Sequence, residues 1–235
     1  MIARRFFLAS ARTNHHLHNM LRILALLLCL GPPARACEVA LLLSIDISGS
    51  IDAGEYAIQT QGLALALSDA AIIDALVAGQ MALAVVHWSG VGRQALVLPW
   101  QRIQTASDVA RFAATVAGQT RRFSASDTAV GQAIDFSAAQ FTAVADCTRK
   151  VIDISGDGPE NSGFTDAAAR ARTQDLGIEI NAIAIEDAGQ TDPVTRYYQK
   201  WVITHGGFVV TARGLEGYPR AMREKLLREV SKLIG

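Results

Sequence analysis

The chain contains few of the side chains that usually bind transition metals, with three cysteines and five histidines among its 235 residues. It has no P-loop, no G-x-G-x-x-G fingerprint and no G-x-S-x-G nucleophile elbow, which argues against nucleotide binding and against a serine hydrolase. It also has no internal repeat, low-complexity tract or linker-like segment, so we expect a single domain.

Acidic residues are missing from the first 36 positions, which instead carry five arginines. An apolar segment at 23–30 is too short to span a bilayer as a helix. It is followed by Ala34, Arg35 and Ala36, which have the small-x-small form of a signal-peptidase site. We therefore predict that residues 1–36 are a signal peptide and that residues 37–235 form the mature domain, with Met20 as an alternative start.

Removal of this leader would leave 17 basic residues against 22 acidic ones, a net charge of about −5. This balance does not favour nucleic acid or an anionic membrane as a partner, and we expect no stable membrane span in the mature chain. We expect an exported protein, periplasmic or secreted. The sequence leaves open whether export uses the Sec or the twin-arginine route, and whether Cys37 at the cleavage point is lipidated.

The mature chain keeps two cysteines, Cys37 and Cys147. Cys37 lies nine residues before Asp46, and Cys147 lies ten residues before Asp157. If the strands that follow the two cysteines are parallel neighbours, both cysteines lie at the same end of the sheet, where a disulfide is geometrically reasonable. In an oxidising compartment this predicts a Cys37–Cys147 disulfide, with two free thiols as the alternative.

Segments with strand and helix patterns alternate along the mature chain. Strands are expected from Leu41 onward and at 81–89, 94–103, 150–155, 178–186 and 207–212, and helices at 56–76, 109–118, 129–144, 166–177, 193–205 and 218–234. Asp52 and Glu55 have the spacing of a capping box for the first helix, and Pro99 marks an edge strand. Such alternation is typical of an α/β fold with a doubly wound, mostly parallel sheet, one antiparallel edge strand and helices on both faces.

Polar residues gather where predicted strands end and where one helix begins. The segments DISGS, SASDTAVG and GDG are expected at the edge formed by the carboxyl ends of the strands, where doubly wound sheets bind ligands. They supply five oxygen-bearing side chains: Asp46, Ser48, Ser50, Thr128 and Asp157. Two carboxylates and three hydroxyls suit a hard cation, Mg²⁺ first and Mn²⁺ or Ca²⁺ as alternatives. Because hydroxyls add no charge, such a cation would remain electrophilic toward a carboxylate from a partner.

This pattern resembles a known family. D-x-S-x-S after a buried first strand, a threonine in a helix-opening loop and Asp-Gly after a later strand resemble the von Willebrand factor A domain with its metal-ion-dependent adhesion site (MIDAS). The resemblance covers roughly Val39 to Ile234. Within that family the chain is similar to a bacterial group of small exported single-domain proteins that share VDVSGS-like and VIDVSGDG-like segments.

The resemblance implies a role for each candidate ligand. Ser48 and Ser50 would bind the metal directly with Asp46 close by, Thr128 would bind directly in the ligand-competent state, and Asp157 would bind directly or through water. The family's usual sheet also places the first strand beside the strand that begins near residue 150, as the predicted disulfide requires.

The sequence departs from the family pattern beside the site. Gly156 precedes Asp157 where the family commonly has Thr-Asp-Gly, so a hydroxyl often present there is missing. Glu160 and Asp127 add carboxylates that could compete for the metal or repel an acidic partner.

We therefore predict a metal-dependent protein-binding module rather than an enzyme, with a partner protein that presents an Asp or Glu carboxylate. A metal-assisted hydrolase and a domain with a purely structural metal are the alternatives. His87, at the end of a buried strand, is expected to be a packed core residue rather than a general base. Arg121 and Arg122 are expected to be solvated, and the alternating charges of the last helix, Glu229 included, are expected to form its outer face.

Overall fold

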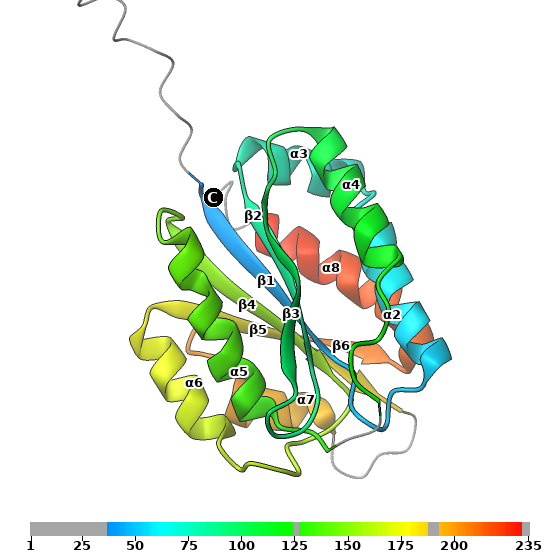
Figure 1. Cartoon of the computed structure of the whole chain (residues 1–235), viewed down its shortest axis with the longest axis vertical. Coiled ribbons are helices and arrows are strands. Elements are labelled where there is room, and N and C mark those ends of the chain that lie inside the picture. Colours follow the sequence, from blue (N-terminus) through cyan, green and yellow to red (C-terminus); the bar gives the residue numbers. More distant parts are fainter. Residues whose placement is uncertain (1–36, 125–126, 188–192, 232–235) are drawn as a thin grey trace, which may run out of the picture. The chain divides into compact units, whose positions relative to one another are not determined.

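The computed structural model describes residues 37–124, 127–187 and 193–231; the predicted signal peptide and its alternative start lie outside these ranges. Within them, one sheet has six strands in the order β3-β2-β1-β4-β5-β6 (Figure 1). The strands are β1 (Val39–Asp46), β2 (Ala82–Trp88), β3 (Gln94–Arg102), β4 (Arg149–Gly156), β5 (Ile178–Glu186) and β6 (Val209–Arg213). The edge strand β3 pairs antiparallel with β2, and every other pair of neighbours is parallel.

Helices cover both faces of this sheet. The helices are α2 (Ala53–Ala66), α3 (Ala70–Ala78), α4 (Ala106–Ala117), α5 (Val130–Ala139), α6 (Asp166–Asp175), α7 (Val194–Tyr197) and α8 (Tyr218–Ser231), within the described part of the chain. A π-helix, Tyr198–Val202, continues α7, and 3-10 turns occupy Gln140–Val144 and Leu215–Gly217. Helices α2, α3, α4 and α8 pack on one face and α5, α6 and α7 on the other (Figure 1). The predicted doubly wound α/β architecture is confirmed.

Strand β1 is buried along its whole length, which explains its lack of a helical or alternating pattern. Leu41 and Leu43 belong to the core on the α2 and α8 side, and Leu42 belongs to the core on the α5 side. The strand lies between β2 and β4. Its last residue, Asp46, therefore lies at the middle of the carboxyl edge.

The predicted disulfide between Cys37 and Cys147 is present. Strands β1 and β4 are parallel neighbours with Val39 opposite Arg149, so the two cysteines lie just before paired residues. The Thr148 N–H donates to the Cys37 carbonyl at 3.0 Å and extends the pairing to the disulfide. A lipid on Cys37 would need the same sulfur, so this disulfide and lipidation at Cys37 exclude each other.

The helix predicted at 56–76 is interrupted in the structure. The Asp69 carboxylate accepts the N–H groups of Ala71 at 2.9 Å and Ile72 at 3.4 Å, so it caps a new helix, α3. Helices α2 and α3 meet at a bend of 70°. The prediction of one helix was wrong because apolar residues continue at helical spacing on both sides of the cap. Among the described residues no single helix is long and apolar enough to cross a bilayer, although α2 and α3 together, as a bent pair, are.

The prediction that the charges of α8 form an outer face was wrong for two of them. Lys225 is 0% exposed and Glu229 is 1% exposed. Lys225 Nζ lies 2.6 Å from Asp153 Oδ1 on β4 and 3.3 Å from Glu229 Oε1. Burial raises the pKa of Asp153 to about 6, while the positive charge of Lys225 opposes the rise.

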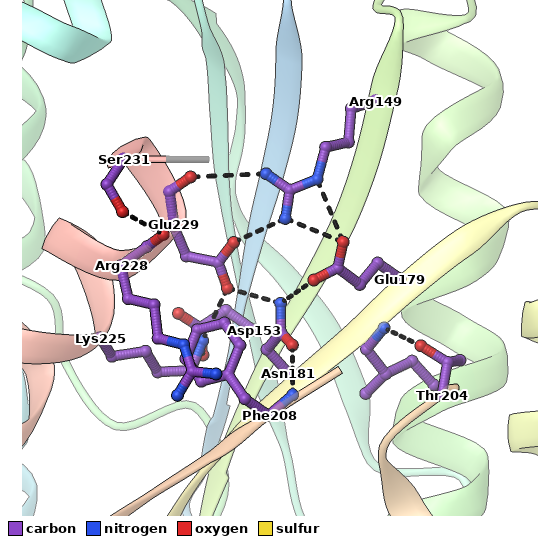
Figure 2. Close-up of polar contacts among 11 residues, drawn as sticks. Arg149, Asp153, Glu179, Asn181, Thr204, Phe208, Lys225, Arg228, Glu229 and Ser231 are labelled. Atoms are coloured by element: carbon purple, nitrogen blue, oxygen red, sulfur yellow. Dashed lines mark hydrogen bonds and ion pairs between the residues drawn. The ribbon is translucent and has the colours of Figure 1, made fainter. Parts of the chain in front are cut away.

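Further polar residues of β4 and β5 complete this network (Figure 2). Arg149 donates to Glu229 and to Glu179, each at 2.9 Å, and the Asn181 amide donates to both carboxylates at 2.6 Å. We call the set the buried ion cluster: Arg149, Asp153, Glu179, Asn181, Lys225 and Glu229. Each buried charge faces one of opposite sign, which is the condition under which charges persist in an interior.

Candidate metal centre

The end of β1 turns sharply around the Asp46 carboxylate. Asp46 is 0% exposed, and its Oδ1 accepts the backbone N–H of Ser48 at 2.7 Å. The Ile47 N–H donates to the Trp88 carbonyl at 2.9 Å, which keeps the chain paired with β2 one residue beyond the strand. Ser48 is buried beside Asp46, and Ser50 reaches the surface. The DISGS segment is therefore anchored at its start and opens outward at its end.

A run of hydrogen bonds connects this turn to the end of β4. The Ser50 hydroxyl donates to Asp157 Oδ1 at 2.9 Å, and the Ser48 and Ser50 hydroxyl oxygens lie 3.2 Å apart. Four of the five predicted ligands, Asp46, Ser48, Ser50 and Asp157, thus form one connected group at the carboxyl edge.

The fifth predicted ligand, Thr128, lies at the same edge and is 6% exposed. The loop after β4 holds it: the Thr128 N–H donates to Asn161 Oδ1 at 2.8 Å, and the Asn161 N–H donates to the Thr128 carbonyl at 3.0 Å. Thr128 forms no hydrogen bond with the other four ligands in the described part of the chain. Asn161 was not identified from the sequence, where its only signal is its place in the loop GDGPENSG.

Arg121 clamps the DISGS turn, so the prediction that it is solvated was wrong. Its guanidinium donates to the carbonyl of Ile47 at 2.8 Å and to the carbonyl of Ser48 at 2.6 Å. Arg122, its neighbour, is exposed as predicted. The clamp fixes the backbone between Asp46 and Ser48 from outside, and it places a positive charge next to the turn.

Glu160 does not act as a free carboxylate beside the site. Its Oε1 accepts the Gly131 N–H at 2.9 Å, and its Oε2 accepts the N–H groups of Thr165 at 2.7 Å and Asp166 at 3.0 Å. Glu160 therefore caps the first turns of both α5 and α6. A Cβ on Gly131 would come within 2.4 Å of the Thr165 hydroxyl, so this close approach requires glycine. Asp127 is exposed beside Thr128.

Without a cation, the ionised forms of the two carboxylates in the site are destabilised by burial and by their mutual repulsion. Burial raises the pKa of Asp46 to about 7, and the charge of Asp157 adds to the rise. Burial also raises the pKa of Asp157, although the hydrogen bond from Ser50 opposes the rise. Asp46 Oδ2 is buried and accepts no hydrogen bond from a described residue. A cation at the site would offset both the repulsion and the desolvation.

The donor set fits a hard divalent cation. No group of three or more His, Cys, Asp and Glu residues in the described ranges could hold a metal ion. A metal at this edge would therefore depend on the hydroxyls of Ser48, Ser50 and Thr128 together with the two carboxylates. Oxygen ligands of this kind are preferred by Mg²⁺ and Ca²⁺.

The two histidines of the described residues lie apart from this group. His87 is 0% exposed, its Nε2 lies 3.3 Å from the Tyr56 hydroxyl, and burial lowers its pKa to about 4. It is the packed core histidine that the sequence predicted. His205 is exposed, and its backbone N–H donates to Gln174 at 2.9 Å.

Comparison with known proteins gives one family and one fold. A family model described as "Protein of unknown function (DUF1194)" matches residues 36–234. A search of curated proteins finds no match. Solved structures match over most of the chain, but their sequence identities are low, so these matches establish a shared fold only.

Three of these structures illustrate the range. Proximal thread matrix protein 1 from the mussel byssus matches with a TM-score of 0.61 at 16% identity, over 82% of this chain and 48% of that chain. A von Willebrand factor type A protein from Catenulispora acidiphila matches with a TM-score of 0.57 at 21% identity, over 84% and 43%. The conserved hypothetical protein BatB from Bacteroides thetaiotaomicron matches with a TM-score of 0.53 at 17% identity, over 83% and 99%. The chain spans about half the length of the first two. Another structure of the mussel protein is described as having a zinc-occupied MIDAS motif.

Proposed function

The chain belongs to the DUF1194 family and has the von Willebrand factor A fold, and from this premise we propose that it is an exported, metal-dependent protein-binding module. Asp46, Ser48, Ser50, Thr128 and Asp157 would hold a divalent cation. A bound cation supplies a Lewis-acidic position at which an Asp or Glu carboxylate of a partner protein completes the coordination.

The connected group at the carboxyl edge carries this proposal. Hydrogen bonds join Asp46 to Ser48, Ser48 to Ser50 and Ser50 to Asp157, a residue 107 positions further along the chain than Ser50. This brings together oxygen ligands from two neighbouring strands around a buried carboxylate oxygen that lacks a partner among the described residues. The zinc-occupied MIDAS motif of the mussel protein supports metal binding by this fold. We propose Mg²⁺ as the native cation, because all five side chains offer oxygen, with Mn²⁺ and Ca²⁺ as substitutes.

The surface beside the site favours an acidic partner. Pro159, two residues after Asp157, lines a cavity of about 320 Å³ together with residues of the segment Pro193–Trp201. Arg196 and Lys200 are among these residues, and none of the described lining residues carries a carboxylate. Lys200 Nζ lies 4.6 Å from the centre of the Trp201 ring, and Trp201 is 38% exposed. Two cations and an aromatic ring around a cavity that the loop after Asp157 also lines suit a partner segment with more than one acidic residue.

We propose that the protein acts in the periplasm or as a secreted protein. The disulfide between Cys37 and Cys147 supports an oxidising compartment. It also favours an unlipidated Cys37, because the same sulfur would have to carry the lipid. The predicted signal peptide, residues 1–36, accounts for export in this proposal.

Titration of Mg²⁺ into residues 37–235, which contain every described element, tests the proposal by calorimetry. Asp46→Ala should abolish the binding because it removes the central carboxylate. Asp74→Ala, on the exposed face of α3, is the matched control and should bind as the wild type does. Acetate or a Glu-rich peptide should then bind only in the presence of the metal.

Each other outcome has a distinct meaning. Equal Mg²⁺ binding by wild type and Asp46→Ala would refute the assigned site. Metal binding that raises the melting temperature but recruits no carboxylate would indicate a structural metal. Turnover of a phosphate or carboxylate ester that a chelator abolishes would indicate a hydrolase.

A further inference from the structure

Behind the candidate metal centre, three buried polar atoms have no hydrogen-bond partner among the described residues. They are Asp46 Oδ2 at the end of β1, Trp88 Nε1 at the end of β2, and the hydroxyl of Tyr198, the first residue of the π-helix. All three side chains are 0% exposed. Unsatisfied buried polar atoms are uncommon in proteins, and three from three different elements call for a common explanation.

Gly156 shows that these side chains converge on one point. A Cβ built on Gly156 would lie 2.3 Å from the Tyr198 hydroxyl, 3.0 Å from Asp46 Oδ2 and 3.4 Å from Cζ2 of Trp88. The Tyr198 hydroxyl and the free Asp46 oxygen therefore lie on the same side of the β4 backbone, close enough for one water molecule to bridge them. A larger residue at position 156 would displace the Tyr198 hydroxyl.

We propose that Tyr198 is a positioning residue of the metal centre, whose hydroxyl donates to Asp46 Oδ2 through one bridging water. This inference rests on the proposed function. The Tyr198 hydroxyl would take the place of the hydroxyl that the family pattern commonly has at position 156. The chain would then supply this hydroxyl from the π-helix instead of from β4.

The chemistry of the Asp46 carboxylate supports this role. Its Oδ1 already accepts the Ser48 N–H at 2.7 Å. The second oxygen is buried without a hydrogen-bond partner among the described residues, and a buried polar atom is stable only when a donor or a cation faces it. A tyrosine hydroxyl carries one proton that it can donate to such an oxygen. Donors behind a metal-ligating group commonly fix its orientation and its affinity for the metal.

The surroundings of Tyr198 hold its ring in place. The ring packs edge-on against Tyr197, with 5.5 Å between ring centres. The Tyr197 hydroxyl donates to Asp166 at 2.6 Å, which ties it to the start of α6. The Ile203 N–H donates to the Tyr198 carbonyl at 3.0 Å across the π-turn. A π-turn inserts one residue into a helix and often occurs at functional sites, and here it begins at the residue that faces Asp46.

Tyr198→Phe tests the inference because it removes the hydroxyl and keeps the ring. Tyr218→Phe is the matched control: Tyr218 is also 0% exposed and its hydroxyl has no partner among the described residues, but it begins α8 and belongs to the core on the other face of the sheet. We expect Tyr198→Phe to weaken Mg²⁺ binding roughly 10- to 100-fold and Tyr218→Phe to leave it unchanged. The melting temperatures of the two metal-free variants should be similar, which separates positioning from a general loss of stability.

A second variant covers the case in which Tyr198→Phe does not fold. Gly156→Ala displaces the Tyr198 hydroxyl and should also weaken Mg²⁺ binding. Wild-type affinity in Tyr198→Phe or in Gly156→Ala would overturn the positioning role while leaving the proposed function intact. A wild-type protein that binds no Mg²⁺, Mn²⁺ or Ca²⁺ would overturn the proposed function, and the positioning role with it.

Discussion

Replacing Lys225 with methionine should strongly destabilise the protein, because it removes the cation of the buried ion cluster and keeps an unbranched side chain. Lys225 Nζ lies 2.6 Å from Asp153 and 3.3 Å from Glu229. At an effective dielectric constant of about 20, these distances correspond to gross attractions of about 6 and about 5 kcal/mol. The desolvation of the three charged groups opposes most of this attraction.

The net loss comes mainly from the partner that Lys225 leaves behind. Glu229 keeps Arg149 and Asn181, whereas Asp153 keeps no ion pair with any described residue. Removing one member of a buried ion pair typically costs about 3–5 kcal/mol, and we expect a loss in this range near pH 7.5. The loss should be smaller near pH 5, because the pKa of Asp153 is about 6 and its carboxyl is then largely protonated in the wild type as well.

Urea unfolding at the two pH values measures this prediction. Arg220→Met, at an exposed position on the same helix, is the matched control and should change the free energy of unfolding by no more than about 0.5 kcal/mol. A loss below about 1 kcal/mol for Lys225→Met near pH 7.5, the value typical of an exposed pair, would refute the reasoning. An equal loss at both pH values would show that Asp153 is not the group left uncompensated.

Two further predictions concern the metal centre. The pKa of Asp46 is about 7 in the folded chain and 3.8 in the unfolded reference, so the metal-free folded state holds this proton more tightly. The free energy of unfolding of the metal-free protein should therefore fall by as much as about 4 kcal/mol as the pH rises from about 4 to about 7. Mg²⁺ should cancel this fall in stability. Melting temperatures at pH 5 and pH 7.5, with and without Mg²⁺, test this prediction. An identical pH profile with and without the metal would contradict the assignment of Asp46 to the metal site. Arg121→Met should weaken Mg²⁺ binding about tenfold because the DISGS turn loses its clamp, whereas Arg122→Met should not, and calorimetry that finds equal affinities for these two variants would refute a role for the clamp.

The order and type of the elements could be predicted because the buried strands of this fold appear in the sequence as continuous apolar segments. Strand β1 is buried on both faces and therefore reads as an unbroken aliphatic segment, and Pro99 marked the edge strand β3. The break between α2 and α3 was missed although Asp69 is a good capping residue, because the apolar pattern passes through it. Local polar signals are weak when hydrophobic periodicity points the other way.

The connected part of the candidate site could be predicted for a similar reason. Asp46, Ser48 and Ser50 lie within five residues, and Asp157 directly follows a neighbouring strand. Arg121 and Glu160 were misjudged because they bind backbone carbonyls and amides of distant segments, which have no residue-specific signature. Lys225 and Glu229 were misread as surface charges because mixed charge is also the usual pattern of an exposed helix face.

The disulfide has a mechanical consequence for the proposed partner-binding module. Tension pulling the two ends of the domain apart would enter at Cys37 and pass through the sulfur atoms to Cys147, so it would bypass residues 38–146. About 36–39 nm of extended chain would remain outside the load path. Four of the five candidate ligands lie in this unloaded segment, and Asp157 alone lies in the loaded one. A pulling force would therefore act on the metal ligands through β4, the strand that directly precedes Asp157, before it could stretch the segment that carries the other four ligands.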